Sequence, residues 1–191
     1  MDAVGAISLL LLCAPVMVAV AVLIKLDSDG PVLVRQPRVG QHGRIFTLLK
    51  FRSMVHNAES LRDDLLHLSH VDGPIFKLRN DPRRTRVGRH LRRMSVDELP
   101  QLLNVLRGEM SLVGPRPPFL HEVEADYMSQ SRRLKFPPGM TGLWQVSGRS
   151  LLQYEQMVGL DIRYTRQWSL WLDLRILAKT IPVVVSGKGA Y

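Results

Sequence analysis

The sequence predicts a mainly helical α+β protein with one membrane-inserted helix at the N-terminus, a short β-hairpin and a larger helical remainder. Three patterns support this: an uncharged apolar run over positions 3–24, a strand-turn-strand pattern over 32–49, and helical spacing of leucines after position 98. A chain of 191 residues is long enough for one domain with a core. We therefore expect a membrane segment over residues 1–25 and one cytosolic domain over residues 26–191.

The N-terminal run has no charged residue between Ala3 and Ile24. As a helix it would rise roughly 30 Å, enough to cross the hydrocarbon core of a bilayer. It lacks the basic start and the small-residue cleavage site of a signal peptide, so we expect it to be retained. Pro15 removes a backbone hydrogen bond in mid-run, so we expect a break or kink there. The helix then either spans the membrane or folds back, and Lys25 favours the cytoplasmic side in both cases.

The charge of the chain predicts anionic partners. The formal net charge is +9, and 20 of the 26 positive residues are arginine, whose planar fork matches phosphate oxygens. Nucleic acid, an anionic lipid surface and phosphate-bearing small molecules are the candidates. The basic segment 83–93 has no aromatic residue on which bases could stack, which argues against nucleic acid. Cys13 is the only cysteine, so an internal disulfide is excluded.

Local patterns place the next elements. Residues 32–36 and 44–49 are expected to form strands joined by a turn at 40–43. A helix is expected over about 57–69, where leucines give an apolar side. Residues 80–89 are expected to form a basic loop and 114–118, rich in proline, a stiff irregular loop.

The clearest helical spacing follows the acidic pair at positions 97 and 98. Leucines at 99, 102, 103 and 106 lie on one side, and Gly108 follows as a stop. Asp97 is the preferred N-cap, because Pro100 then lies at the third helical position, where no intrahelical bond is lost. Ser150 and Gln153 resemble a capping box that opens a helix to about Trp168. The last segment, 168–185, is either an amphipathic helix in the membrane interface or a terminal helix packed on the core.

Asp97 and Glu98 allow two interpretations. In the structural one, Asp97 caps a helix and Glu98 complements the helix dipole. In the functional one, a carboxylate at a helix N-terminus stays ionised where phosphates are drawn. The basic segment before the pair would supply positive charge, and Mg²⁺ typically takes one or two carboxylates plus substrate phosphates. The six histidines show no metal-ligand spacing, and no phosphate-binding loop, nucleophile elbow or dinucleotide fingerprint is present.

Five stretches of the chain, in this order, match motifs of a known family. They are KLDSDGP at 25–31, RQPRVG at 35–40, KFRSM at 50–54, DELPQLLNVLRGEMSLVGPRP at 97–117 and PGMTGLWQVSGR at 138–149. With them the chain resembles the monotopic phosphoglycosyl transferases, the bacterial sugar transferase family. The match covers nearly the whole length.

The resemblance implies a two-step transfer of a phospho-sugar. Asp97 would attack the β-phosphate of a UDP-sugar and release UMP, and the acceptor undecaprenyl phosphate would then take the phospho-sugar from the carboxylate. Glu98 would help to bind Mg²⁺, with Asp97 as the other metal ligand, or manage the proton of the acceptor. The expected phosphate or substrate contacts are Lys50, Arg52, Arg89, Arg116, Gln145 and Arg149.

The resemblance also bears on the membrane helix. In this family the helix breaks at a Ser-Pro pair and re-enters the cytoplasmic leaflet; here the pair is Ala14-Pro15, which lacks the hydroxyl. We therefore expect a re-entrant helix in a bacterial inner membrane, in contact with membrane lipids, with the active site on the cytoplasmic face. Many relatives carry further membrane helices and a domain upstream, so this chain is either a short form or a fragment.

The sequence leaves two alternative functions: an inactive membrane-bound relative that acts as a scaffold, and a membrane-tethered nucleic-acid-binding protein. An intact Asp97-Glu98 pair argues against the first and the missing aromatics against the second. The sequence indicates neither the sugar nor the oligomeric state.

Overall fold

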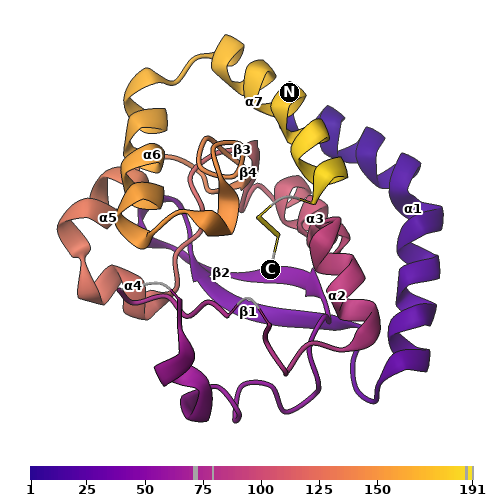
Figure 1. Ribbon diagram of the computed structural model, residues 1–191. Helices are drawn as coiled ribbons and strands as arrows, with labels where there is room; N and C mark the ends of the chain where they lie inside the picture. Colours follow the sequence, from indigo (N-terminus) through magenta and orange to yellow (C-terminus); the bar gives the residue numbers. More distant parts are fainter. Residues whose placement is uncertain (71–72, 79, 188, 191) are drawn as a thin grey trace.

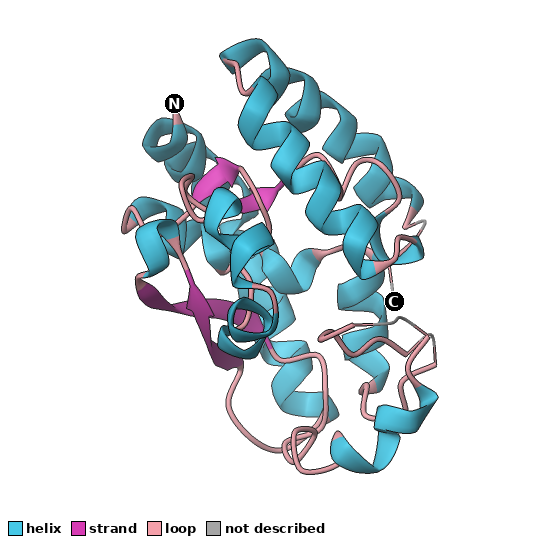
Figure 2. Ribbon diagram, turned by 90° about the vertical axis from the view of Figure 1, so that its left-hand side faces the viewer, coloured by secondary structure: helices cyan, strands magenta, loops and turns pink. Residues whose placement is uncertain are grey.

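A small antiparallel hairpin lies along one side of the molecule, with one face covered by helices and the other largely exposed (Figure 1 and Figure 2). The computed structural model describes residues 1–70, 73–78, 80–187 and 189–190. Most regular structure is helical, which confirms the mainly helical α+β class with a hairpin near the N-terminus.

Helix α1 (Asp2–Asp27) is the one helix of the described residues that is long and apolar enough to cross a membrane. It is continuous through Pro15, and the break expected there stays a prediction. Figure 1 shows that its ribbon bends along its length. Most of its side chains are exposed, including Leu11, Leu12 and Leu26 at 74%, 75% and 80%.

The predicted hairpin is confirmed. Strand β1 (Leu33–Val39) pairs antiparallel with β2 (Ile45–Phe51), and a 3₁₀ turn over Gln41–Gly43 joins them. Residues opposite each other in a ladder point to the same face of the sheet. The pairs Arg38↔Phe46 and Gln36↔Leu48 therefore share a face with Lys50.

Two predictions between the hairpin and position 94 are wrong. Residues 57–69 form turns and a 3₁₀ helix (Asp63–Leu68) rather than an α-helix. Its leucines are largely exposed, for example Leu66 at 47%, so no apolar partner stabilises a short helix. Conversely, part of the expected basic loop is helix α2 (Arg86–Arg93), because the Thr85 hydroxyl caps it by accepting the Gly88 N–H at 2.9 Å.

Short elements complete the domain. Helix α3 spans Gln101–Leu106, α4 Leu120–Ala125 and α5 Tyr127–Arg133. Strands β3 (Ser111–Val113) and β4 (Gly139–Thr141) pair in parallel, a sheet that the sequence did not predict. Figure 2 shows the two small sheets lying apart, with helices along their sides.

Two helices close the chain, α6 (Tyr154–Gln167) and α7 (Leu170–Ser186). The predicted Ser150 cap is wrong, because residues Arg149–Leu151 form a separate 3₁₀ turn. The backbone N–H of Gln153 instead donates to the Gln156 side chain at 3.0 Å. One side of α7 packs on the core through Ile176, while Trp171 and Val185 are 68% and 82% exposed. The interfacial position of this outer side stays a prediction.

One apolar core joins α1 to the rest of the protein. Its buried members come from helices and strands far apart in the sequence and include Ala6, Leu48, Leu102, Leu112, Tyr164 and Ile176. A second cluster packs α2 against the C-terminal half of α1 through Val20, Ile24 and Leu91. The membrane helix is therefore part of the folded domain along much of its length.

Candidate active site

The turn that carries Asp97 and Glu98 begins in an uncommon backbone conformation. Ser95 has a φ of 54°, in the left-handed region that few non-glycine residues adopt. Its carbonyl accepts the Glu98 N–H at 3.2 Å, which closes a 3₁₀ turn over Val96–Glu98. Residues of this kind cost roughly 1–3 kcal/mol and concentrate at functional sites, where the surroundings hold them in place.

The prediction that Asp97 is a helix N-cap is wrong. Helix α3 begins at Gln101, and Pro100 occupies the position before it with a φ of −60°. Proline is accommodated there because the first turn of a helix does not use its N–H groups. Among the described residues, no other residue donates a hydrogen bond to the Asp97 side chain, so this carboxylate is free to meet a ligand.

The two carboxylates differ in exposure and in partner. Asp97 is 6% exposed, and this burial raises the pKa of its carboxyl group, although the Lys50 ammonium opposes the rise. The Glu98 side chain is 37% exposed and pairs with Lys50, Nζ to Oε1, at 2.8 Å. Burial alone would raise the pKa of Glu98, but Lys50 lowers it. Glu98 is thus the firmly ionised member, while Asp97 is buried and unpaired.

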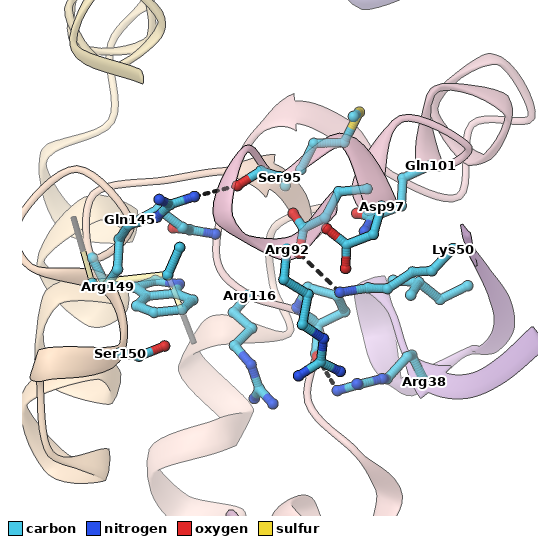
Figure 3. A pocket seen from close by; sticks show the side chains of 18 residues that line it. Arg38, Lys50, Arg92, Ser95, Asp97, Gln101, Arg116, Gln145, Arg149 and Ser150 are labelled. Carbon is cyan, nitrogen blue, oxygen red and sulfur yellow. Dashed lines mark hydrogen bonds and ion pairs between the residues drawn. The ribbon is translucent and has the colours of Figure 1, made fainter. Parts of the chain in front are cut away.

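A cavity of about 250 Å³ opens beside this turn. Six of the predicted site residues line it: Lys50, Asp97, Glu98, Arg116, Gln145 and Arg149. Figure 3 labels all of them except Glu98 and shows their side chains gathered around one space from separate parts of the chain. Among the described residues, five cationic side chains face two carboxylates here, an excess of positive charge that favours a phosphate-bearing ligand.

Arg116 is held rigidly at one wall. Its guanidinium forms a two-pronged pair with Glu122, which is fully buried, at 2.8 and 3.1 Å. The backbone of Arg116 is fixed as well, because its N–H donates to Asp161 at 3.1 Å and its carbonyl accepts from Arg133 at 2.9 Å. A guanidinium has five N–H donors, so a pair with one carboxylate leaves donors for a phosphate.

Arg149 connects the carboxylate turn to the C-terminal helix. Its guanidinium donates to the Ser95 hydroxyl and, at 3.5 Å, to the Val183 carbonyl in α7. Like Ser95, it has a φ of 54°. Two strained residues from distant parts of the chain therefore meet at the edge of the cavity.

Two predicted phosphate contacts do not line this cavity. The Arg52 guanidinium binds the carbonyls of Ser28 and Asp29, both at 2.6 Å, and so fastens the chain after α1. Arg89 lies on the exposed side of α2, in a separate surface hollow with Arg86, His90 and Arg93.

Two cations that the sequence did not single out do line the cavity. Arg38 is 7% exposed, and its Nε has no hydrogen-bond partner among the described residues. Burial lowers the pKa of Arg38, and the nearby Arg116 lowers it further. Its other nitrogens donate to the Pro117 carbonyl at 3.1 Å and to the Gln36 side chain at 3.2 Å, but neither partner is charged. A phosphate at this position would supply the missing negative charge. Arg92, the other, donates from Nε to the Ser53 hydroxyl at 2.9 Å.

The missed residues had signals in the sequence. Arg38 lies inside the RQPRVG motif, and alternation along β1 would have placed it on the face of Lys50. Recognising 86–93 as a helix would have placed Leu91 on the packed side and Arg89 on the exposed side. Trp144, which also lines the cavity, stands next to the predicted Gln145.

The two carboxylates are suited to a magnesium ion only together with a substrate. Asp97 and Glu98 lie on one turn at the cavity wall. No group of three or more histidine, cysteine, aspartate or glutamate side chains in the described part of the chain could hold a metal alone. Mg²⁺ characteristically takes one or two carboxylates and completes its shell with water and phosphate oxygens. The donor set therefore fits this ion when a phosphate is bound.

Comparison with known proteins agrees with this geometry. Residues 1–187 match the family model described as "Bacterial sugar transferase". The whole chain is 47% identical to the galactosyl transferase CpsE of Streptococcus agalactiae serotype III (strain NEM316) and 45% identical to the undecaprenyl-phosphate galactose phosphotransferase of Salmonella typhimurium (strain LT2). It spans 42% and 40% of their lengths. It is also 41% identical to the exopolysaccharide production protein ExoY of Rhizobium meliloti (strain 1021), of which it spans 86%.

Proposed function

This chain belongs to the bacterial sugar transferase family, and on that premise we propose that it transfers a sugar-1-phosphate from a UDP-sugar to undecaprenyl phosphate. The names of its relatives support the acceptor and the reaction class. The ExoY relatives support a role in making an exopolysaccharide or a related capsule, O-antigen or glycoconjugate. The scaffold and nucleic-acid alternatives are not favoured, because the carboxylate pair lies intact in a cation-lined cavity.

One observation carries the mechanism: Asp97 is a buried carboxylate at the wall of this cavity, and no side chain of the described residues is hydrogen-bonded to it or forms an ion pair with it. A carboxylate held for structural reasons is normally paired when it is buried. A carboxylate that must attack phosphorus needs at least one oxygen without a protein partner, close to the cations that hold its target. Asp97 meets both conditions.

In the first step, an Asp97 oxygen forms a bond to the β-phosphorus of the UDP-sugar. The bond from that phosphorus to the bridging oxygen breaks, and UMP leaves with the electron pair. The phospho-sugar is then an acyl phosphate on Asp97. Lys50, Arg38 and Arg92 would hold the diphosphate and compensate the charge that develops on its oxygens.

In the second step, a phosphate oxygen of undecaprenyl phosphate attacks the same phosphorus. The bond to Asp97 breaks, which restores the carboxylate and gives an undecaprenyl diphosphate-sugar. Glu98, kept ionised by Lys50, would bind the metal or accept the proton of a singly protonated acceptor phosphate. Splitting the transfer in this way lets donor and acceptor use one cavity in turn.

Magnesium is part of this proposal, with Asp97 and Glu98 as its protein ligands. When bound, it would neutralise charge on the diphosphate oxygens. We expect a chelator to abolish the reaction and added Mg²⁺ to restore it.

Re-entry of α1 into the cytoplasmic leaflet is also part of the proposal. Both ends of the helix contact the same domain: Asp2 accepts the Leu112 N–H at 3.3 Å, and Asp27 accepts the Val87 N–H at 3.0 Å. A straight crossing would separate these two contacts by the thickness of the bilayer. Re-entry keeps the active site at the cytoplasmic face, where the acceptor phosphate and the nucleotide sugar meet.

The reaction is tested with the purified full chain, Mg²⁺, undecaprenyl phosphate and a panel of UDP-sugars, with UMP release as the readout. Absence of UMP with every donor, while the Salmonella relative works in the same assay, would refute the proposed activity.

The nucleophile is tested separately: the intact mass of the protein after incubation with donor alone should show the phospho-sugar adduct. Asp97→Asn should lose the adduct, and Asp64→Asn, at an exposed position outside the cavity, should keep it. An adduct on Asp97→Asn would reassign the nucleophile.

A further inference from the structure

Helix α2 carries a stripe of exposed basic side chains that the proposed reaction does not use. Arg86, Arg89, His90 and Arg93 follow at i, i+3, i+4 and i+7, so they lie on one face of the helix. All four are exposed and line one surface hollow. The ion pairs of the described residues include none with these side chains.

The opposite face of α2 is fastened to the C-terminal half of α1. Leu91 is 3% exposed and packs with Val20 and Ile24. The backbone N–H of Val87 donates to Asp27, the last residue of α1. Figure 1 shows α2 lying beside this half of α1. The basic stripe is therefore fixed at the point where the apolar helix ends.

The other end of α2 meets the end of α7. Gly187 caps α7, and a β-carbon added there would lie 2.8 Å from Cγ of Arg93. Just before this cap, Ile181 and Val185 are 67% and 82% exposed. The two helices with the most exposed apolar side chains, α1 and α7, thus both end beside α2.

We propose that this stripe binds the phosphate headgroups of acidic phospholipids in the cytoplasmic leaflet. Its charge is complementary to such a surface, and its position puts it at headgroup level when the apolar side chains of α1 and α7 enter the membrane. The stripe has no phenylalanine, tyrosine or tryptophan for base stacking, which disfavours nucleic acid. The proposal goes beyond the sugar transfer, does not depend on it, and gives Arg89 a lipid partner in place of the substrate phosphate.

The test measures which lipids the full chain retains. Purified protein in detergent is mixed with equal amounts of phosphatidylglycerol and phosphatidylcholine, and bound lipids are counted by native mass spectrometry. The wild type should retain phosphatidylglycerol preferentially. The triple variant R86Q/R89Q/R93Q should lose that preference by at least tenfold, since each basic residue near an anionic surface contributes about fivefold.

Two matched variants separate this stripe from general effects. R35Q/R44Q/R132Q removes the same charge from exposed positions elsewhere and should keep the preference. R86K/R89K/R93K keeps the charge of the stripe and should also keep it, which excludes misfolding as the cause of a loss.

Equal retention of the two lipids by the wild type would overturn the proposal. So would an undiminished preference in R86Q/R89Q/R93Q, or a preference lost equally in R35Q/R44Q/R132Q. Binding of a short single-stranded oligonucleotide that displaces phosphatidylglycerol and depends on the three arginines would reassign the surface to nucleic acid.

Discussion

At the scale of single residues, the site works through opposite environments for two adjacent carboxylates. Burial raises the pKa of Asp97, which makes it a stronger nucleophile once it is ionised but also easier to protonate. Lys50 opposes this rise and holds Glu98 ionised. The ammonium of Lys50 therefore favours the ionised form of both carboxylates, against the effect of burial.

This arrangement predicts a pH dependence. The reaction needs ionised Asp97, so its rate should fall as pH decreases through the raised pKa of Asp97. Lys50→Gln removes the charge that lowers this pKa, so the acid limb of kcat/KM against pH should move to higher pH. The loss of a phosphate contact should also reduce the rate at neutral pH by roughly 100-fold or more.

The control for this prediction is Lys50→Arg, which keeps the charge and should keep the acid limb near its wild-type position. An acid limb at the same pH in Lys50→Gln and the wild type would show that Lys50 does not tune Asp97.

The family motifs identified six of the cavity residues from sequence, because each lies in a motif with an associated chemistry. The contrast between Asp97 and Glu98 could not be predicted in this way. It depends on Lys50, which is 48 residues away from Glu98 in the chain and is brought to it by β2. Arg52 lies in a motif and Arg89 in the basic segment, but their neighbours in the fold place both outside the cavity.

At the scale of elements, the close approach of α2 to the end of β2 positions Arg92. A β-carbon at Gly88 would lie 2.0 Å from the Ser53 carbonyl oxygen, which is backbone and cannot move freely. We expect Gly88→Ala to push α2 away, to destabilise the protein by about 1–3 kcal/mol, and to lower the rate of sugar transfer because Arg92 moves with its helix. Thermal unfolding in detergent and UMP release measure the two effects.

Gly159 is the matched control. It lies in the interior of α6, is exposed, and a β-carbon there would meet nothing within 4 Å. Gly159→Ala should stabilise the protein by about 0.5–1 kcal/mol, because alanine loses less backbone entropy in a helix. Equal effects of the two substitutions would contradict the close packing at Gly88.

A second joint fastens α3 to β2 through a fully buried amide. Asn104 accepts the Leu49 N–H at 3.0 Å and donates to the Thr47 carbonyl at 2.8 Å. Asn104→Ala should leave both backbone groups unsatisfied, at a cost of about 2–4 kcal/mol. The thermal unfolding midpoint should fall by about 5–10 °C. Arg107→Ala, exposed just after the same helix, should leave it nearly unchanged, and a similar fall in both would refute this role.

The sequence predicted those helices and strands whose characteristic residues lie close together in the chain. The hairpin and the two C-terminal helices have their turn residues and periodicity within a short window. The parallel pair β3–β4 joins residues more than 25 positions apart and has no such signal. The expected helix at 57–69 had leucines but no surface to bury them, which only the tertiary structure could reveal.

At the scale of the whole molecule, α1 acts as both membrane anchor and core element. Ala6 near its start is fully buried in the main core with Tyr164 and Ile176, and Ile24 near its end is buried against α2. Between them the outer side of the helix is exposed and apolar. One side of the anchor therefore packs on the domain in both of its halves, which the apolar run alone could not indicate.

This geometry predicts that both ends of α1 face the cytoplasm. In a Cys13→Ser background, a cysteine inserted between Met1 and Asp2, and separately Leu26→Cys at the exposed C-terminal end, would be treated with a membrane-impermeant maleimide. Both should react in inside-out vesicles and neither in cells whose outer membrane alone is permeabilised. A helix that crosses the bilayer would instead expose the inserted cysteine in the cells. Because the Asp2–Leu112 and Asp27–Val87 contacts cannot both form in that arrangement, such labelling would refute the re-entrant topology together with the docking of α1 on the domain.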